Sequence, residues 1–253
     1  MKHWSVSFIG ILSLSVGISV LLIIEIFTSN ELSVDRIHNN ASRIFKVSYG
    51  SSSSTPGPLS GLLASEFPEI QEATHFETNQ LFATSPVLNY DNNPIEIDGY
   101  YSIDSSFFEL FDFKVTHGDV NTALRTPFSM ILTESEAMRI FNSQNPIGKT
   151  VIWKIFKDFT FTVGAVVKDP PQNSSIRFNG FISETSVKKM GFSYPDDWGY
   201  TPYETYLLLN PEVNTMSLEE KLRDFLIDYY ASNLSTSPSL LLCFFASGER
   251  TNG

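Results

Sequence analysis

The segment Asn145-Pro146-Ile147-Gly148-Lys149-Thr150 ends like a phosphate-binding loop, because Gly-Lys-Thr closes the Walker A pattern Gly-x-x-x-x-Gly-Lys-Thr. In that pattern bare backbone amides surround the phosphates, and the loop opens a helix whose amino end holds them. Here position 143 is Ser instead of the first glycine, and the residues VIWKIF that follow are typical of a strand. We therefore predict a turn between a helix and a strand, with no nucleotide cofactor.

His75-Phe76-Glu77 places a histidine and a second potential metal ligand two residues apart in a stretch that reads as a strand. On a strand, positions 75 and 77 share a face, so both side chains would point to the same side. The other histidines, His3, His38 and His117, are widely spaced, and the single cysteine is Cys243. Because zinc needs three or four donors, we predict no metal site.

Two other short motifs contain side chains that hydrolases use. Ser186-Val187-Lys188-Lys189 matches the Ser-x-x-Lys pattern of some acyl enzymes, but the companion motifs Ser-Asp-Asn and Lys-Thr-Gly are missing. We expect a solvated helix turn there. Asp196-Asp197-Trp198 offers two carboxylates, but no second acid can be tied to them, and a turn is the better interpretation. No catalytic residue is assigned, and the chain is not predicted to be an enzyme.

The composition indicates a folded body with an acidic surface. Hydrophobic residues make up 42% of the 253 residues and charged residues 18%, which is typical of globular proteins. Asp and Glu number 28 against 17 Lys and Arg, which gives a formal net charge of −11. Such a surface repels phosphate backbones, so nucleic acid is excluded as a partner. With one cysteine, no intrachain disulfide can form.

The amino terminus contains an uncharged apolar segment, Val6 to Ile24, between Lys2 and Glu25. At 1.5 Å per residue it would span about 28 Å, close to the hydrocarbon thickness of a bilayer. We predict a transmembrane helix within residues 1–28, with the amino terminus in the cytoplasm because Lys2 precedes the span. A cleaved signal peptide and a buried soluble helix are the alternatives; the apolar run is long for a signal, and no Ala-x-Ala-like site follows it.

The residue patterns after the amino-terminal segment predict an α+β fold. Helical spacing or capping boxes predict helices at 31–40, 59–73 and 105–111, from about 134, and from 217 to about 229. Alternating patterns predict strands at 43–49, 95–102, 150–156, 159–168, 178–183 and 205–209, and two more between 74 and 96 around the turn at 91–94. Beyond Ala231 the chain becomes rich in Ser and Thr, and we predict a disordered tail over 231–253.

Several segments in this order resemble the MacB-like periplasmic core domain of FtsX-type ABC-transporter permeases. The matching stretches cover about residues 5 to 225, and their order carries more weight than any one of them. They are SNELSVDRIHNNASRIFKV, LLASEFPEIQEAT, SIDSSFFELFDFKVTHGD, SMILTESEAMRIFNSQNPIGKTV, FTVGAVVKDPPQNSSIRF and TYLLLNP.

The resemblance implies an organisation, a location and partners. It implies a membrane helix followed by a two-lobed external region, with one discontinuous lobe of residues 29–95 plus 200–230 and an inserted lobe of residues 96–199. The chain would be a single-pass protein of the bacterial inner membrane with its main domain in the periplasm. Expected partners are a cytoplasmic ABC ATPase subunit or domain, further permease helices in a homodimer or pseudo-dimer, membrane lipid and an outer periplasmic protein.

The function implied is to transmit ATP-driven motion across the membrane, so that a substrate is moved or released without catalysis by this chain. Family permeases continue into further membrane helices, whereas this chain turns into TSPSLLLCFFASGERTNG, so we expect a truncated or frame-disrupted permease. The alternative from another class is a ligand-sensing domain of a membrane-anchored receptor, which would need a second span. An anchored hydrolase is the weakest alternative, because no nucleophile and base can be paired.

Overall fold

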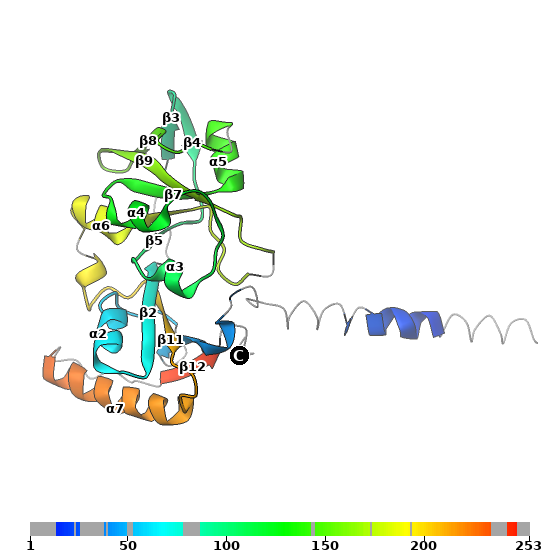
Figure 1. Ribbon diagram of the computed structural model, residues 1–253, viewed down its shortest axis with the longest axis vertical. Coiled ribbons are helices and arrows are strands. Elements are labelled where there is room, and N and C mark those ends of the chain that lie inside the picture. The colour runs from blue at the N-terminus through cyan, green and yellow to red at the C-terminus, as the bar shows by residue number, and fades with distance from the viewer. Residues whose placement is uncertain are drawn as a thin grey trace, which may run out of the picture.

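The computed structural model shows an elongated body built on a long mixed sheet (Figure 1). The structure describes the following residues: 14–22, 24–25, 38, 40–49, 53–77, 87–142, 145–172, 174–192, 194–233 and 242–246.

Twelve strands are described. In chain order they are β1 (Ile44–Tyr49), β2 (Ile70–Glu77), β3 (Val87–Tyr90), β4 (Asn93–Glu96), β5 (Tyr100–Ile103), β6 (Val115–Gly118), β7 (Ser129–Thr133), β8 (Thr150–Lys154), β9 (Asp158–Val167), β10 (Gly180–Ser183), β11 (Tyr203–Leu209) and β12 (Leu242–Ala246). Their order in the sheet is β12-β1-β11-β2-β5-β10-β7-β9-β8-β3-β4, and β6 pairs with β9. The pairs β5–β10 and β7–β9 are parallel and the others antiparallel, so the predicted mixed α/β body is confirmed.

Helices cover both faces of this sheet. They are η1 (Ala41–Arg43), α2 (Leu59–Glu66), α3 (Phe107–Leu110), α4 (Val120–Arg125), α5 (Glu134–Phe141), α6 (Glu184–Lys189), η2 (Tyr194–Asp196) and α7 (Thr215–Asn233). The helix start predicted from the Thr-x-x-Glu pattern at 133–136 is confirmed, and Thr133 caps α5, because its side chain accepts from the Glu136 amide; the Thr133 amide itself donates to Asn179. For α7 the capping residue is Asn214, whose Oδ1 accepts from the Ser217 amide, so the helix starts before the predicted position.

The base half, as we call it, consists of β12, β1, β11 and β2 with α2 and α7, at the bottom of Figure 1. Leucines of α2 and α7 pack together on one face of these strands, among them Leu63 and Leu222, which are fully buried. The predicted helix over 59–73 is too long. It ends at Glu66 because Pro68 forces Phe67 into an extended conformation, and β2 then begins at Ile70.

The tip half consists of the other strands, β5, β10, β7, β9, β8, β3, β4 and β6, with α3, α4, α5 and α6. Its core on one face centres on Trp153 of β8, which is fully buried beneath residues of α5 and α6. Three structural elements of this half, β6, α4 and β7, have no counterpart among the elements predicted from the sequence.

The structure assigns two segments differently from the predicted domain limits. Residues 87–95 were predicted in the discontinuous lobe, but β3 pairs with β8 and therefore belongs to the tip half. The predicted disordered tail is also wrong in part, because α7 continues to Asn233 and β12 pairs along β1. The run LLLCFFA is rich in β-forming residues, and the open edge of β1 supplies the hydrogen-bond partners that sequence alone cannot locate.

The predicted membrane segment lies only partly within the described residues. Positions 14–22 and 24–25 are helical, and their apolar side chains are exposed. Figure 1 draws this helix in blue. Of the residues described, none form a helix with both the length and the apolar character that crossing a bilayer requires. The predicted helix over 31–40 lies outside the described residues except at His38 and Asn40. The transmembrane helix stays a prediction.

Candidate functional site: the junction between base half and tip half

The base half and the tip half meet where β2 lies beside β5. These strands share one residue pair, Phe76 with Ile103, whereas β2 pairs with β11 over the whole length of β11. The backbone link between the halves is therefore narrow, and side chains on the two faces of the sheet make most of the remaining contact. We call this region the junction.

One face of the junction is built from aromatic rings, and we call it the aromatic face. Phe76 of β2 contacts Phe107 of α3 with ring centroids 5.8 Å apart and stacks on Tyr206 at the same distance. Phe111 contacts Tyr206 at 5.3 Å, so rings of the tip half pack directly on the base half. The cluster continues through Phe113, Phe178 and Phe181. Contacts of this kind bury much apolar surface and have no strict direction.

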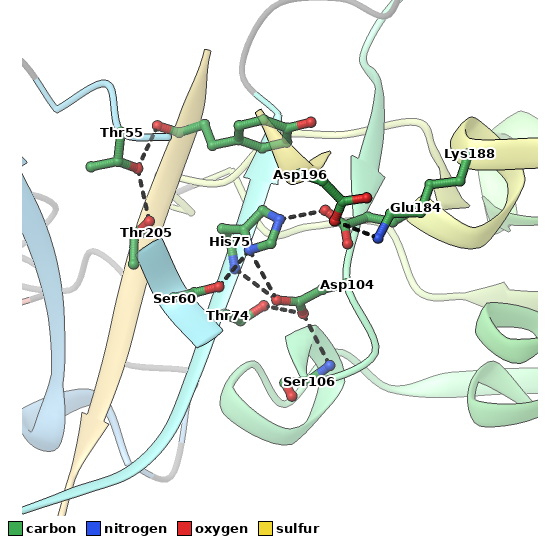
Figure 2. Close-up of polar contacts among 11 residues, drawn as sticks. Thr55, Ser60, Thr74, His75, Asp104, Ser106, Glu184, Lys188, Asp196 and Thr205 are labelled. Atoms are coloured by element: carbon green, nitrogen blue, oxygen red, sulfur yellow. Dashed lines mark hydrogen bonds and ion pairs between the residues drawn. The ribbon is translucent and has the colours of Figure 1, made fainter. Parts of the chain in front are cut away.

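The opposite face is polar, because His75 and Glu77 alternate with Phe76 along β2. His75 is buried at the centre of this polar face, as Figure 2 shows. Its Nδ1 lies 2.6 Å from the Ser60 hydroxyl of α2, and its Nε2 contacts Glu184 at the start of α6. Since Ser60 belongs to the base half and Glu184 to the tip half, the imidazole connects the two halves.

Asp104 extends the link beyond the single strand pair. It follows β5 directly, and its Oδ2 accepts from the His75 backbone amide at 3.0 Å and lies 3.3 Å from His75 Nδ1. Its Oδ1 accepts from the Thr74 hydroxyl at 2.6 Å and from the Ser106 amide at 3.0 Å. The carboxylate thus takes the place of a backbone acceptor where β2 and β5 diverge (Figure 2).

Burial and charge shift the pKa values of this polar face. Burial lowers the pKa of His75, but the hydrogen bond and charge of Glu184, with the charge of Asp104, outweigh it and leave the pKa raised. Burial raises the pKa of Asp104, against the opposing effects of His75 and Thr74. Burial also raises the pKa of Glu77 to about 7, with a further increase from the Glu184 charge and a decrease from the Tyr200 hydrogen bond.

His75 and Glu77 do lie on one face, as predicted, but their surroundings are those of a hydrogen-bonded junction. Within the described part of the chain, no three His, Cys, Asp or Glu side chains are arranged to hold a metal ion. The partners of His75 come from segments far apart in the sequence, Ser60, Asp104 and Glu184, and sequence reasoning missed all three. Serines and acids are common near helix starts, so no local pattern distinguishes them.

The Gly-Lys-Thr segment is a turn between α5 and β8, as predicted. Gly148 has a φ of +80°, which suits glycine, and it lines a cavity of about 430 Å³ together with Ile147, Phe128 and the amino end of α4. The charged residue in that lining is Asp119, an anion, so the cavity walls would repel a phosphate. The Lys149 ammonium lies over the Phe141 ring at 5.4 Å.

The side chains of the two other candidate motifs make contacts that stabilise the fold. The Ser186 side chain is buried, which corrects the prediction of a solvated turn; its hydroxyl accepts from the Phe128 amide at 3.0 Å. Asp196 pairs with Lys188 at 2.8 Å, and Asp197 accepts from the Gly199 amide at 2.8 Å, in the predicted turn. The ion pair between Lys188 and Asp196 joins α6 to the segment that returns to the base half.

Solved structures share this fold. A domain of a protein assigned as a permease, from Porphyromonas gingivalis, aligns with a TM-score of 0.68 and 23% identity over 83% of this chain and 92% of that one. The periplasmic region of MacB from Actinobacillus actinomycetemcomitans aligns with a TM-score of 0.58 and 19% identity, covering 82% and 90%.

The extracellular domain of the noncanonic ABC-type transporter YknZ from Gram-positive bacteria aligns with a TM-score of 0.55 and 14% identity, covering 80% and 99%. These identities establish likeness of fold. No curated protein matches the chain. The model of the MacB-like periplasmic core domain matches residues 7–225, which is most of the sequence. The chain therefore belongs to the family of MacB-like periplasmic core domains of ABC-transporter permeases.

Proposed function

We propose that this chain transmits ATP-driven motion from a membrane-embedded transporter to an external surface, so that a substrate is moved or released without catalysis by the chain itself. The observation that carries the proposal is the narrow junction, where one strand pair and two side-chain clusters join the halves. A thin connection between two well-packed bodies lets them move relative to each other as units.

A second contact connects the segment before β1 to the tip half. The His38 ring lies 5.1 Å from Phe111 and 5.2 Å from Phe113, and its Nδ1 accepts from the Asp112 amide at 3.0 Å. His38 is at the end of the predicted helix 31–40, which follows the predicted membrane helix. A displacement of that helix would therefore act on both the base half and the tip half.

The proposed partners follow from this role and from the family. They are a cytoplasmic ABC ATPase subunit or domain, further permease helices in a homodimer or pseudo-dimer, membrane lipid, and an outer periplasmic protein. The proposed location is the bacterial inner membrane with a single pass in this chain and the main domain in the periplasm. The division into a discontinuous lobe and an inserted lobe is part of the same proposal, with residues 87–95 moved to the inserted lobe.

The first test is whether an ATPase accompanies the chain. The full chain is isolated in mild detergent from the cells that produce it, and the co-purifying proteins are identified. We expect an ATP-binding subunit, and we expect ATP hydrolysis by the complex to change the distance between spin labels on the base half and the tip half. ADP serves as the control nucleotide. Recovery without any ATPase, or a distance that hydrolysis leaves unchanged, would refute the proposal.

A further inference from the structure

Glu77 is the most unusual group of the polar face. It is the last residue of β2 and its side chain is 2% exposed. Its Oε1 accepts from the Tyr200 hydroxyl at 3.0 Å, while its Oε2 has no hydrogen-bond partner within the described residues. Burying a carboxyl group with a single hydrogen bond costs much more free energy when the group is ionised than when it is protonated.

The groups around Glu77 are mainly acidic. The charge of Glu184 of α6 raises the pKa of Glu77, and the charge of Glu77 raises the pKa of Tyr203 of β11. The titratable and charged groups that face this cluster from the surrounding elements are His75, Asp104, Glu184, Lys188, Asp196, Tyr200 and Tyr203. Counting Glu77 itself, the cluster contains four carboxyl groups and two basic groups, His75 and Lys188. Lys188 is paired with Asp196.

These positions matter because Glu77 and Glu184 lie on opposite sides of the junction. Glu77 belongs to the base half and Glu184 to the tip half, and Glu184 is the residue that holds His75 Nε2. Glu77 lies two residues from His75 on the same face of β2, and His75 contacts Glu184. A negative charge on Glu77 therefore disfavours the negative charge of Glu184 across the junction, whereas a neutral Glu77 leaves Glu184 to pair with His75.

We propose that Glu77 is a pH-sensitive latch: when protonated it leaves the contact between His75 and Glu184 across the junction intact, and when ionised it weakens that contact. This inference rests on the proposed motion between the two halves and adds that pH regulates it. Its test needs neither ATPase nor membrane, so the two proposals can fail separately.

The direction of the pH effect follows from the raised pKa of Glu77. A carboxyl group whose pKa rises on folding binds its proton more tightly in the folded state. Its contribution to stability is fully present below the ordinary value of 4.5 and is lost as the pH rises through about 7. The raised pKa of His75 acts in the same direction, since the protonated imidazole is the form that pairs with Glu184.

The experiment measures the distance between spin labels on the two halves of the full chain in detergent. Asp228 of α7 and Met138 of α5 are exposed, so Asp228→Cys and Met138→Cys carry the labels, with Cys243→Ser to remove the native thiol. At pH 5.5 we expect a narrow distance distribution, and at pH 8.5 a broader one, with a midpoint near 7.

Two variants and a control make the assignment specific. Glu77→Gln cannot ionise, and we expect it to lose most of the broadening at pH 8.5, with only the smaller part that comes from His75 remaining. Tyr200→Phe removes the hydrogen bond that lowers the Glu77 pKa, so its midpoint should move to higher pH. Glu204→Gln removes a carboxylate of β11 that lies on the opposite face of the sheet from Glu77, where it pairs with Lys46, and should behave like the parent.

Several results would overturn the latch. The distribution of the parent chain would be the same at both pH values, or Glu77→Gln would broaden at pH 8.5 as much as the parent chain does. A pH response abolished equally by Glu204→Gln would show a general charge effect instead. If Glu77→Gln does not fold, Tyr200→Phe decides, because a midpoint that stays in place or moves to lower pH contradicts the assignment.

Discussion

The aromatic face and the polar face of the junction join the same two halves of the molecule by different forces. On the aromatic face, Phe76 contacts Phe107 and Tyr206 through ring surfaces of uncharged side chains. On the polar face, His75 and Glu184 form a directional contact between titratable groups. Apolar packing tolerates small sliding movements and changes little with pH, whereas a buried ionic contact is lost when its geometry or protonation changes.

This difference assigns separate tasks to the two faces. The aromatic face supplies the cohesion that keeps the base half and the tip half in one body. The proposal gives the polar face the control of their relative position, because hydrogen bonds require specific distances and angles. Substitutions on the two faces should therefore differ in kind as well as in size.

The largest effect is expected on the aromatic face. Phe107→Ala removes a fully buried ring that contacts Phe76, Phe111 and Phe181, so it should lower the free energy of unfolding by about 3–5 kcal/mol. Denaturant unfolding measures the loss. The matched control is Phe156→Ala, whose ring is 62% exposed and should cost far less. Equal losses in the two variants would argue against the aromatic face as the source of cohesion.

An intermediate effect is expected on the polar face. His75→Ala leaves buried carboxylates without their partner, so we expect a loss of about 1–3 kcal/mol. The double variant with Glu184→Gln should recover part of that loss, since the uncompensated charge is then absent. If the two losses simply add, His75 and Glu184 are not coupled, and the polar face does not act as a unit.

The smallest effect is expected for an ion pair outside the junction. Lys221 of α7 lies 2.7 Å from Glu69, and both residues are partly exposed. Lys221→Ala should cost at most about 1 kcal/mol. The cost should shrink further at 1 M salt, where exposed charges are screened within about 3 Å. A loss comparable to that of His75→Ala would mean that burial does not explain the difference between these charge contacts.

The sequence by itself determined most of the local structure and the family. Strand alternation over 43–49 and 159–168 and the capping box at Thr133 each predicted an element that the structure contains, namely β1, β9 and α5. These signals are local, because side-chain alternation and capping depend on residues a few positions apart. The order of short stretches indicated the family, and the match over 7–225 confirms it.

The tertiary structure alone decided which segments meet. Residues 87–95 join the tip half because β3 pairs with β8, and 242–246 join the sheet because the edge of β1 is open to them. His75 could be seen in the sequence as one side chain of a short motif. Its partners Ser60, Asp104 and Glu184 reach it only through the packing of α2, β2, β5 and α6, and contacts between distant segments leave no periodic pattern in a single sequence.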